Sequence, residues 1–137
     1  MRKVAFLMLF ISLPLMAVDN QIAVPDYTKI HEPYGTKACE KQETNRNMAL
    51  CSQRVLASSK KALDTRYQVV LKTLKIDYPA TAKKLQSTQK MWEAFYPINC
   101  EVGEHESESG TGYSSILDFC LIQMVNERIS YLNTLID

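Results

Sequence analysis

The segment 89-QKMWEAFYPINC-100 holds the chain's one tryptophan, an aromatic pair, a proline and a cysteine. The pattern is helical up to Pro97, which is expected to bend or stop the helix because it lacks the N–H that the carbonyl of Glu93 would accept. Trp92 and Cys100 are about two helical turns apart and share a face if the helix continues. We therefore expect Trp92 to pack into a helical core and Cys100 to anchor the chain's exit from the helix. The alternative is an exposed Trp92 that serves as a binding anchor.

Apolar residues recur at helical spacing in three segments of the chain. Thr44 or Asn45 is expected to cap the first helix, and Pro79 suits the first turn of the second. The first stripe comprises Met48, Cys51, Val55, Leu63, Tyr67, Val70 and Leu74, widened by Leu56 and Leu71. The second comprises Leu85, Gln89, Trp92 and Tyr96. The third begins near Ser114 and comprises Leu117, Cys120, Met124, Arg128 or Ile129, Leu132 and Leu135. No segment alternates as a strand does, so the sequence predicts an all-α fold, a small antiparallel three-helix bundle.

Residues 1–17 have the pattern of a secretory signal peptide, in which Arg2 and Lys3 precede a short apolar run that ends in small residues. The segment 18–38 has two prolines and a glycine and is expected to be a flexible leader. The helical domain is then 39–137. These features predict a periplasmic or secreted protein with no stable membrane anchor after signal cleavage. The alternative is an uncleaved N-terminal anchor.

Charge and length limit the classes of function. Without its signal peptide the chain has about 120 residues, enough for one domain with one modest core. Of the 16 basic residues, 14 remain, against 15 acidic residues. This balance excludes a strongly basic nucleic-acid binder. His31 lies in the predicted leader, where an exposed loop histidine is expected rather than a metal ligand.

The four cysteines are most simply explained as two disulfides in an exported domain. A straight helix would separate Cys39 from Cys51 by about 18 Å, so a bridge between them requires the polar segment before the first helix to fold back. Cys100 and Cys120 flank a glycine-rich segment that can bring them together. We therefore prefer these two pairs, although the sequence allows two other connectivities. Each bridge would stabilise the fold by about 3 kcal/mol in the chain-entropy model.

Several motifs in this order resemble the LprI-type lysozyme inhibitor family. They are C-x11-C, then ALDTRY, then Q-x-x-W with a cysteine eight residues later, then a cysteine followed by an arginine and a leucine. The matching residues are Cys39, Cys51, Leu63, Asp64, Tyr67, Gln89, Trp92, Cys100, Cys120, Arg128 and Leu132. The resemblance implies small helical exported proteins with paired cysteines that inhibit animal-type lysozyme. We expect core or structural roles for Leu63, Tyr67, Trp92, Arg128 and Leu132.

The chain departs from the pattern of that family at three positions. Tyr96 stands where the family usually has an arginine, and Pro97 stands where it usually has an acidic residue. Arg66 or its neighbour replaces a common asparagine. If the family arginine pairs with an acid such as Asp64, that ion pair is missing here. These departures concern the second helix more than the fold.

No catalytic residue, metal or cofactor is predicted. His31 and His105 lie in predicted loops without a partner motif, and no nucleophile elbow or phosphate loop is present. Oxidised cysteines are not nucleophiles. The segment 101-EVGEHESE-108 has the composition to hold a divalent ion weakly, but a solvated acidic loop is the simpler interpretation.

The sequence and the resemblance together predict a binding protein, an inhibitor of animal-type (c-type) lysozyme that acts by occlusion. The segment 101–115 reads as an acidic loop that would be steered toward the basic surface of such a lysozyme. Its neutral tip, 109–114, would enter the cleft, because the cleft is itself lined with carboxylates. The candidate contact residues are Glu104, Glu106, Glu108, Thr111 and Tyr113. One alternative is a surface loop without a binding role, and another is a non-inhibitory periplasmic adaptor or immunity-type protein.

Overall fold

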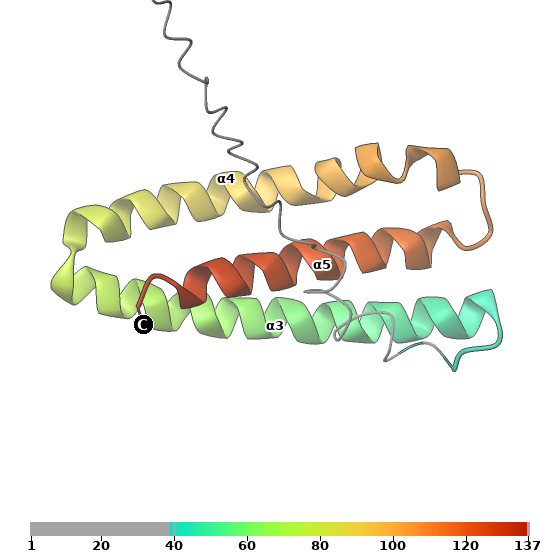
Figure 1. Cartoon of the computed structure of the whole chain (residues 1–137), viewed down its shortest axis with the longest axis horizontal. Helices are drawn as coiled ribbons and strands as arrows, with labels where there is room; N and C mark the ends of the chain where they lie inside the picture. The colour runs from blue at the N-terminus through green and yellow to red at the C-terminus, as the bar shows by residue number, and fades with distance from the viewer. Residues whose placement is uncertain (1–38, 40, 137) are drawn as a thin grey trace, which may run out of the picture.

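The computed structural model describes Cys39 and residues 41–136. Its helices are α3 (Asn45–Asp77), α4 (Pro79–Gly103) and α5 (Tyr113–Asn133), with the short 3-10 helix η1 (His105–Ser107) between α4 and α5. Figure 1 shows that α4 runs back along α3, and that α5 reverses direction again and lies between them in this view. No strand occurs within the described residues. The all-α three-helix prediction is confirmed. The predicted signal peptide 1–17, the leader 18–38 and His31 lie outside the described residues.

Local sequence signals set the ends of the first two helices. The hydroxyl of Thr44 caps α3 by accepting a hydrogen bond of 3.2 Å from the backbone N–H of Asn47. Tyr78 is the single residue between the two helices. Its N–H donates to the carbonyl of Leu74, and its own carbonyl accepts from the backbone N–H of Ala82. Pro79 occupies the first position of α4, where its missing N–H costs nothing. The result is a tight antiparallel hairpin.

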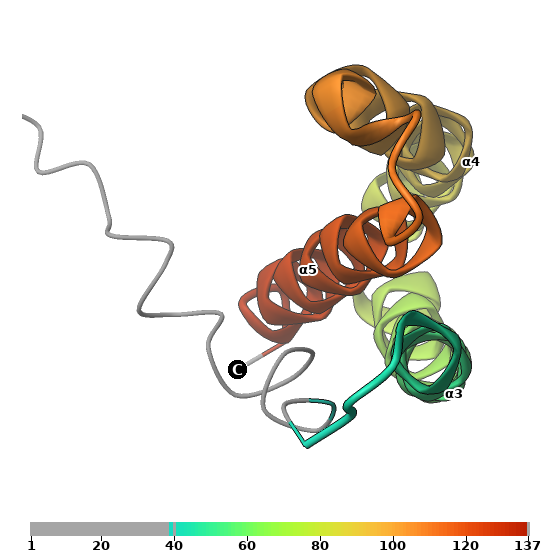
Figure 2. The same ribbon diagram turned by 90° about the vertical axis from the view of Figure 1, so that its right-hand side faces the viewer.

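The hydrophobic core lies where the three helices face one another. Its buried members are Leu63, Val70, Leu71, Leu74, Ala82, Leu85, Tyr96, Val125 and Leu132. Figure 2, which looks along the bundle, shows α5 set to one side of the α3–α4 pair. The contact between α5 and α3 is much more extensive than the contact of α4 with either of them. α4 is therefore the most weakly packed of the three helices.

The buried face of α5 differs from the predicted stripe. Ile122 and Val125 are fully buried or nearly so, whereas Leu117 and Met124 are only half-buried. α5 packs against α3 on one side and faces α4 on another. A helix with two neighbours buries a wider arc than a single stripe.

The expectation that Pro97 stops the second helix is wrong. α4 continues through Pro97 to Gly103. Tyr96 and Cys100 are one turn apart and both are buried, at 7% and 0% exposure, so continuing the helix keeps both side chains on the inner face. This burial and the disulfide at Cys100 offset the hydrogen bond that the proline removes.

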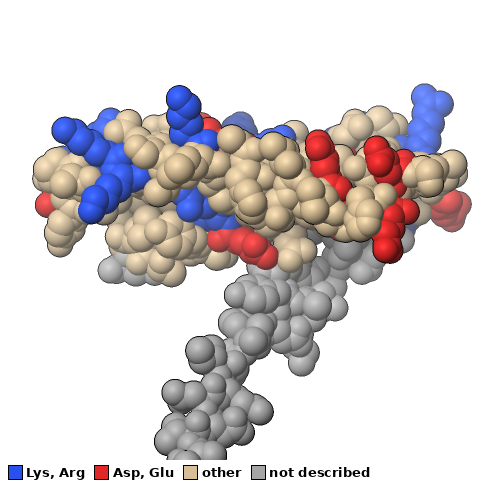
Figure 3. Space-filling view, turned by 90° about the horizontal axis from the view of Figure 1, so that it is seen from above, with Lys and Arg blue, Asp and Glu red and all other residues tan. Residues whose placement is uncertain are grey.

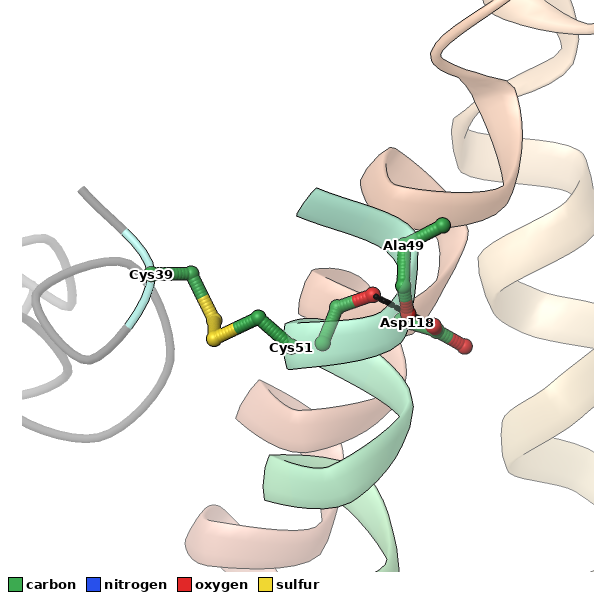
Figure 4. Close-up of a disulfide and its surroundings, with 5 residues drawn as sticks. Cys39, Ala49, Cys51 and Asp118 are labelled. Carbon is green, nitrogen blue, oxygen red and sulfur yellow. Dashed lines mark hydrogen bonds between the residues drawn. A yellow bond between two sulfur atoms is a disulfide. The ribbon is translucent and has the colours of Figure 1, made fainter. Parts of the chain in front are cut away.

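Both predicted disulfides are present. Cys39 pairs with Cys51 at a Cα–Cα distance of 5.8 Å, and Cys100 pairs with Cys120 at 5.7 Å. Figure 4 shows the first bridge, which holds the segment before α3 folded back against the helix. Beside it the buried hydroxyl of Ser52 donates a 2.6 Å hydrogen bond to Asp118 and so links α3 to α5.

Within the part of the chain that the structure describes, no helix is both long enough and apolar enough to cross a membrane.

Candidate functional site

The acidic segment lies at one end of the bundle and is shorter than predicted. Residues 101–103 belong to α4, η1 follows, and Tyr113 already begins α5. The connection between the two helices therefore consists of residues 104–112, of which a third forms η1 and the rest forms turns and a bend. The expected loop 101–115 was too long because its glycines and glutamates are compatible with the ends of helices as well as with loops.

Carboxylates concentrate at this end of the molecule. Glu101, Glu106 and Glu108 are exposed, and Glu104 is half-buried. These charges lie beside the negative, C-terminal end of the α4 dipole, where acidic residues are unfavourable. The last turn of α4 has no basic residue that would offset them. Such an arrangement is not explained by the stability of the helix, and it leaves a local negative field directed into the solvent.

The acidic residues share a pocket with an aromatic ring. Tyr113, Glu108 and Glu101 line a pocket of about 480 Å³ together with Val102, His105 and Leu117. The Nδ1 atom of His105 lies 2.9 Å from the carbonyl oxygen of Val102 and can donate to it. This fixes the imidazole against the end of α4. The pocket combines negative charge, an aromatic face and apolar carbon in one depression.

Of the five predicted contact residues, Glu108 and Tyr113 line this pocket, whereas Glu104, Glu106 and Thr111 do not. Glu106, Glu108 and Thr111 are exposed, whereas Glu104 and Tyr113 are half-buried. Thr111 accepts a 2.8 Å hydrogen bond from the side-chain amide of Asn45. Tyr113 is the first residue of α5 and not the tip of a free loop. The connection is thus tied to the start of α3 by Thr111 and clamped across its ends by Cys100–Cys120.

A second group of residues converges on a groove between α3 and α4. Leu63, Asp64, Tyr67, Gln89 and Trp92 all carry the family resemblance, and all line one groove of about 240 Å³. The groove also contains Lys60, Glu93 and Tyr96. Lys60 and Glu93 were not predicted from the sequence. Their only sequence signal is that each lies four residues, one turn, from a motif residue on the same helix.

Arg128 fastens this groove to α5. Its Nε donates a 2.9 Å hydrogen bond to the side-chain oxygen of Gln89. The guanidinium carbon lies 5.7 Å from the centre of the Trp92 ring and 5.0 Å from that of Tyr131, within the range of cation–π contacts. The Trp92 ring stacks on Tyr96 with 4.3 Å between ring centres. Tyr96 therefore completes an aromatic stack with Arg128 on Trp92.

The environment of the groove shifts two pKa values. Burial lowers the pKa of Arg128, and nearby Tyr131, Tyr67 and Glu93 partly offset this. Burial also raises the pKa of Tyr67, with the carboxylate of Glu93 acting in the same direction. Leu63 and Leu132 lie in the buried core, while Tyr67 and Trp92 pack against its edge, so Trp92 is neither fully enclosed nor a free anchor.

Nothing in the geometry of the described residues groups three or more His, Cys, Asp or Glu side chains around a possible metal ion.

The comparisons with known proteins give one finding. A protein-family model described as "Lysozyme inhibitor LprI" matches residues 36–132. No curated protein and no solved structure matches the chain.

Proposed function

Because the chain belongs to the LprI lysozyme inhibitor family, whose model covers residues 36–132, we propose that it inhibits animal c-type lysozyme by occluding the cleft. The family is one of inhibitors and not of enzymes, and it implies a protein partner. One observation carries the finer proposal. Glu101 and Glu108 line one pocket with Tyr113, and the exposed Glu106 lies in the adjoining connection, whose ends are clamped by the Cys100–Cys120 disulfide.

Electrostatics favours this end of the bundle as the docking surface. Animal lysozymes are basic, so a cluster of carboxylates accelerates encounter and orients the two molecules. The cleft itself contains catalytic carboxylates, and the glutamates would be repelled from its floor. We therefore assign Glu104, Glu106 and Glu108 to the basic rim of the cleft. Thr111 and the neutral residues around it would face the cleft, with the half-buried Tyr113 ring as an apolar contact.

Preorganisation of the connection would keep the cost of binding low. The Cys100–Cys120 bridge closes the ends of the connection, and the Asn45–Thr111 hydrogen bond ties it to α3. A segment that is already ordered loses less conformational entropy when it binds. This supports rigid insertion over folding on contact.

The expected location of the protein is consistent with inhibition of an enzyme outside the cytoplasm. The two disulfides and the family indicate an extracytoplasmic protein. We propose that residues 1–17 are a signal peptide cleaved after Ala17, that 18–38 is a flexible leader, and that 39–137 is the inhibitory domain. The mature protein would then be free in the periplasm or secreted.

The proposed activity is tested by following the lysis of bacterial cell walls by animal lysozyme, through turbidity, with and without the purified oxidised chain. We expect inhibition at equimolar to small molar excess. Because surface charges are screened within about 8 Å at physiological ionic strength and within about 3 Å at 1 M salt, inhibition should weaken steeply as salt is added. The activity of lysozyme alone at each salt concentration is the control.

A second candidate function is a non-inhibitory adaptor or immunity-type protein of the envelope. The groove between α3 and α4 supports this alternative, because it offers a separate mixed-charge and aromatic surface. Full lysozyme activity in micromolar excess of the chain would favour this alternative and contradict inhibition.

A further inference from the structure

The outer face of α4 carries an apolar stripe that no part of the described chain covers. Met91, Phe95, Ile98 and Val102 are 63%, 55%, 61% and 67% exposed. Their spacing of four, three and four residues is that of the core positions of a coiled coil. Exposed apolar residues scattered singly are ordinary, whereas a continuous stripe along a helix indicates a contact surface.

Charge is divided between the two ends of this stripe. Lys83, Lys84 and Lys90 are exposed in the first part of α4, and Glu101, Glu106 and Glu108 are exposed at its far end and beyond. Figure 3 views the bundle from the side of α4 and shows most basic side chains toward the left, a largely uncharged middle, and acidic side chains gathered toward the right, where one basic side chain also projects. The surface is therefore complementary to itself after a half-turn.

We propose that this face of α4 binds the same face of a second copy, with the two helices antiparallel about a two-fold axis. Centring the axis on the stripe places Phe95 opposite the partner's Ile98 and Met91 opposite the partner's Val102. Lys90 then lies opposite the end of the partner's α4, near the partner's Glu101, and Lys84 faces the acidic connection beyond it, which carries the partner's Glu108. A two-fold axis repeats each of these pairs, so every contact is made twice.

Self-pairing matches this face better than other occupants do. A strongly basic partner such as lysozyme would suit the acidic end but would be repelled by the three lysines. The segment 18–38 has no helical period of apolar residues to match the stripe. A second antiparallel copy satisfies the apolar stripe and both charged ends together.

The short length of the apolar stripe predicts a weak dimer contact. Met91 and Val102 are about 16 Å apart along the helix axis, so the buried area lies at the small end of specific interfaces. We expect a monomer–dimer equilibrium that depends on concentration. The inference goes beyond lysozyme inhibition and does not require it, because pairing is measured without lysozyme. Both contacts use the acidic end of α4, so the same copy would not make both at once.

Sedimentation velocity of the oxidised chain starting at residue 18, from about 1 µM to about 500 µM, tests the pairing. We expect the weight-average mass to rise toward that of a dimer over this range. Phe95→Lys combined with Ile98→Lys should keep the chain monomeric throughout. The matched control is Leu50→Lys with Val69→Lys, which changes two exposed apolar residues of α3 and should leave dimerisation unchanged. Circular dichroism verifies that each variant is folded.

A charge exchange tests the antiparallel arrangement. Lys84→Glu should weaken the dimer about tenfold, because the change acts at two symmetric contacts. Adding Glu108→Lys to the same chain should restore it. Three results would each overturn the proposal: a wild-type chain that stays monomeric at every concentration, a dimer unaffected by the α4 substitutions, or pairing that appears only after residues 18–38 are removed. The last result would assign the face to that segment.

Discussion

Replacing Cys100 and Cys120 by serine is expected to lower the free energy of unfolding by about 3 kcal/mol, which is the chain-entropy value for a loop of this length. The bridge spans 20 positions. It joins α5 to α4, which is the helix with the fewest contacts to the rest of the bundle. Because small domains are stable by only about 5–15 kcal/mol, the loss is a large share of the total. Urea unfolding followed by far-UV circular dichroism measures it.

The second disulfide provides the matched control. Cys39→Ser with Cys51→Ser opens a loop of 12 positions and should cost a similar free energy, about 3 kcal/mol. It does not touch the acidic connection, so lysozyme inhibition should survive wherever the variant is folded. The Cys100/Cys120 variant should lose inhibition under the same conditions, because residues 104–112 are no longer clamped. Equal inhibition by both variants would contradict a role for preorganisation.

Neutralising the acidic end is expected to weaken lysozyme inhibition about 10- to 100-fold in the variant Glu104→Gln/Glu106→Gln/Glu108→Gln. Each substitution keeps the size of the side chain and removes one charge that would face the basic rim. Most of the loss should appear in the association rate, since rim charges act mainly by steering. Stopped-flow binding at low salt, together with the turbidity assay, separates the association rate from the dissociation rate.

Net charge alone must be excluded as the cause of that loss. The control variant Asp64→Asn/Asp77→Asn/Glu93→Gln also removes three negative charges, but from exposed positions outside the connection. We expect its inhibition to stay within about threefold of wild type, because the removed charges lie away from the docking end. If the two triple variants lose inhibition equally, the acidic end is not the contact surface.

α3 and α4 were predictable from sequence because each has a local signal at its start. Thr44 supplies a side-chain cap, Pro79 fits a first turn, and the apolar spacing of α3 and α4 matches one buried face. The cysteine pairing followed from reach, since the polar segment after Cys39 can fold back and the segment before Cys120 can turn. These signals involve residues that are close together in the sequence, so they can be recognised without knowledge of the tertiary structure.

The features that the sequence did not predict depend on tertiary packing. Pro97 lies inside α4 because Tyr96 and Cys100 are buried on one face, and burial outweighs a local breaking tendency. Ile122 and Val125 are the buried centre of α5 because that helix has neighbours on two sides. One stripe of apolar residues along a helix does not predict contacts with two neighbouring helices.

The candidate site was only partly predictable. The accumulation of glutamates between Cys100 and Cys120 pointed to one end of the molecule, and the structure adds Glu101 and His105 to the pocket that contains Tyr113. The position of Tyr113 at the start of α5 required the length of the connection to be known. The groove of motif residues was not predicted, because Asp64 and Gln89 are 25 positions apart in sequence and meet only through the α3–α4 hairpin.

The claim that the chain inhibits lysozyme by occlusion is tested most directly by competition at equilibrium. Binding of the oxidised chain to animal lysozyme is measured by calorimetry, first alone and then with an N-acetylglucosamine oligosaccharide saturating the cleft. Occlusion predicts a stoichiometric complex whose apparent affinity falls in proportion to the occupancy of the cleft by the sugar. No detectable complex, or a complex formed equally well when the cleft is filled, would contradict it.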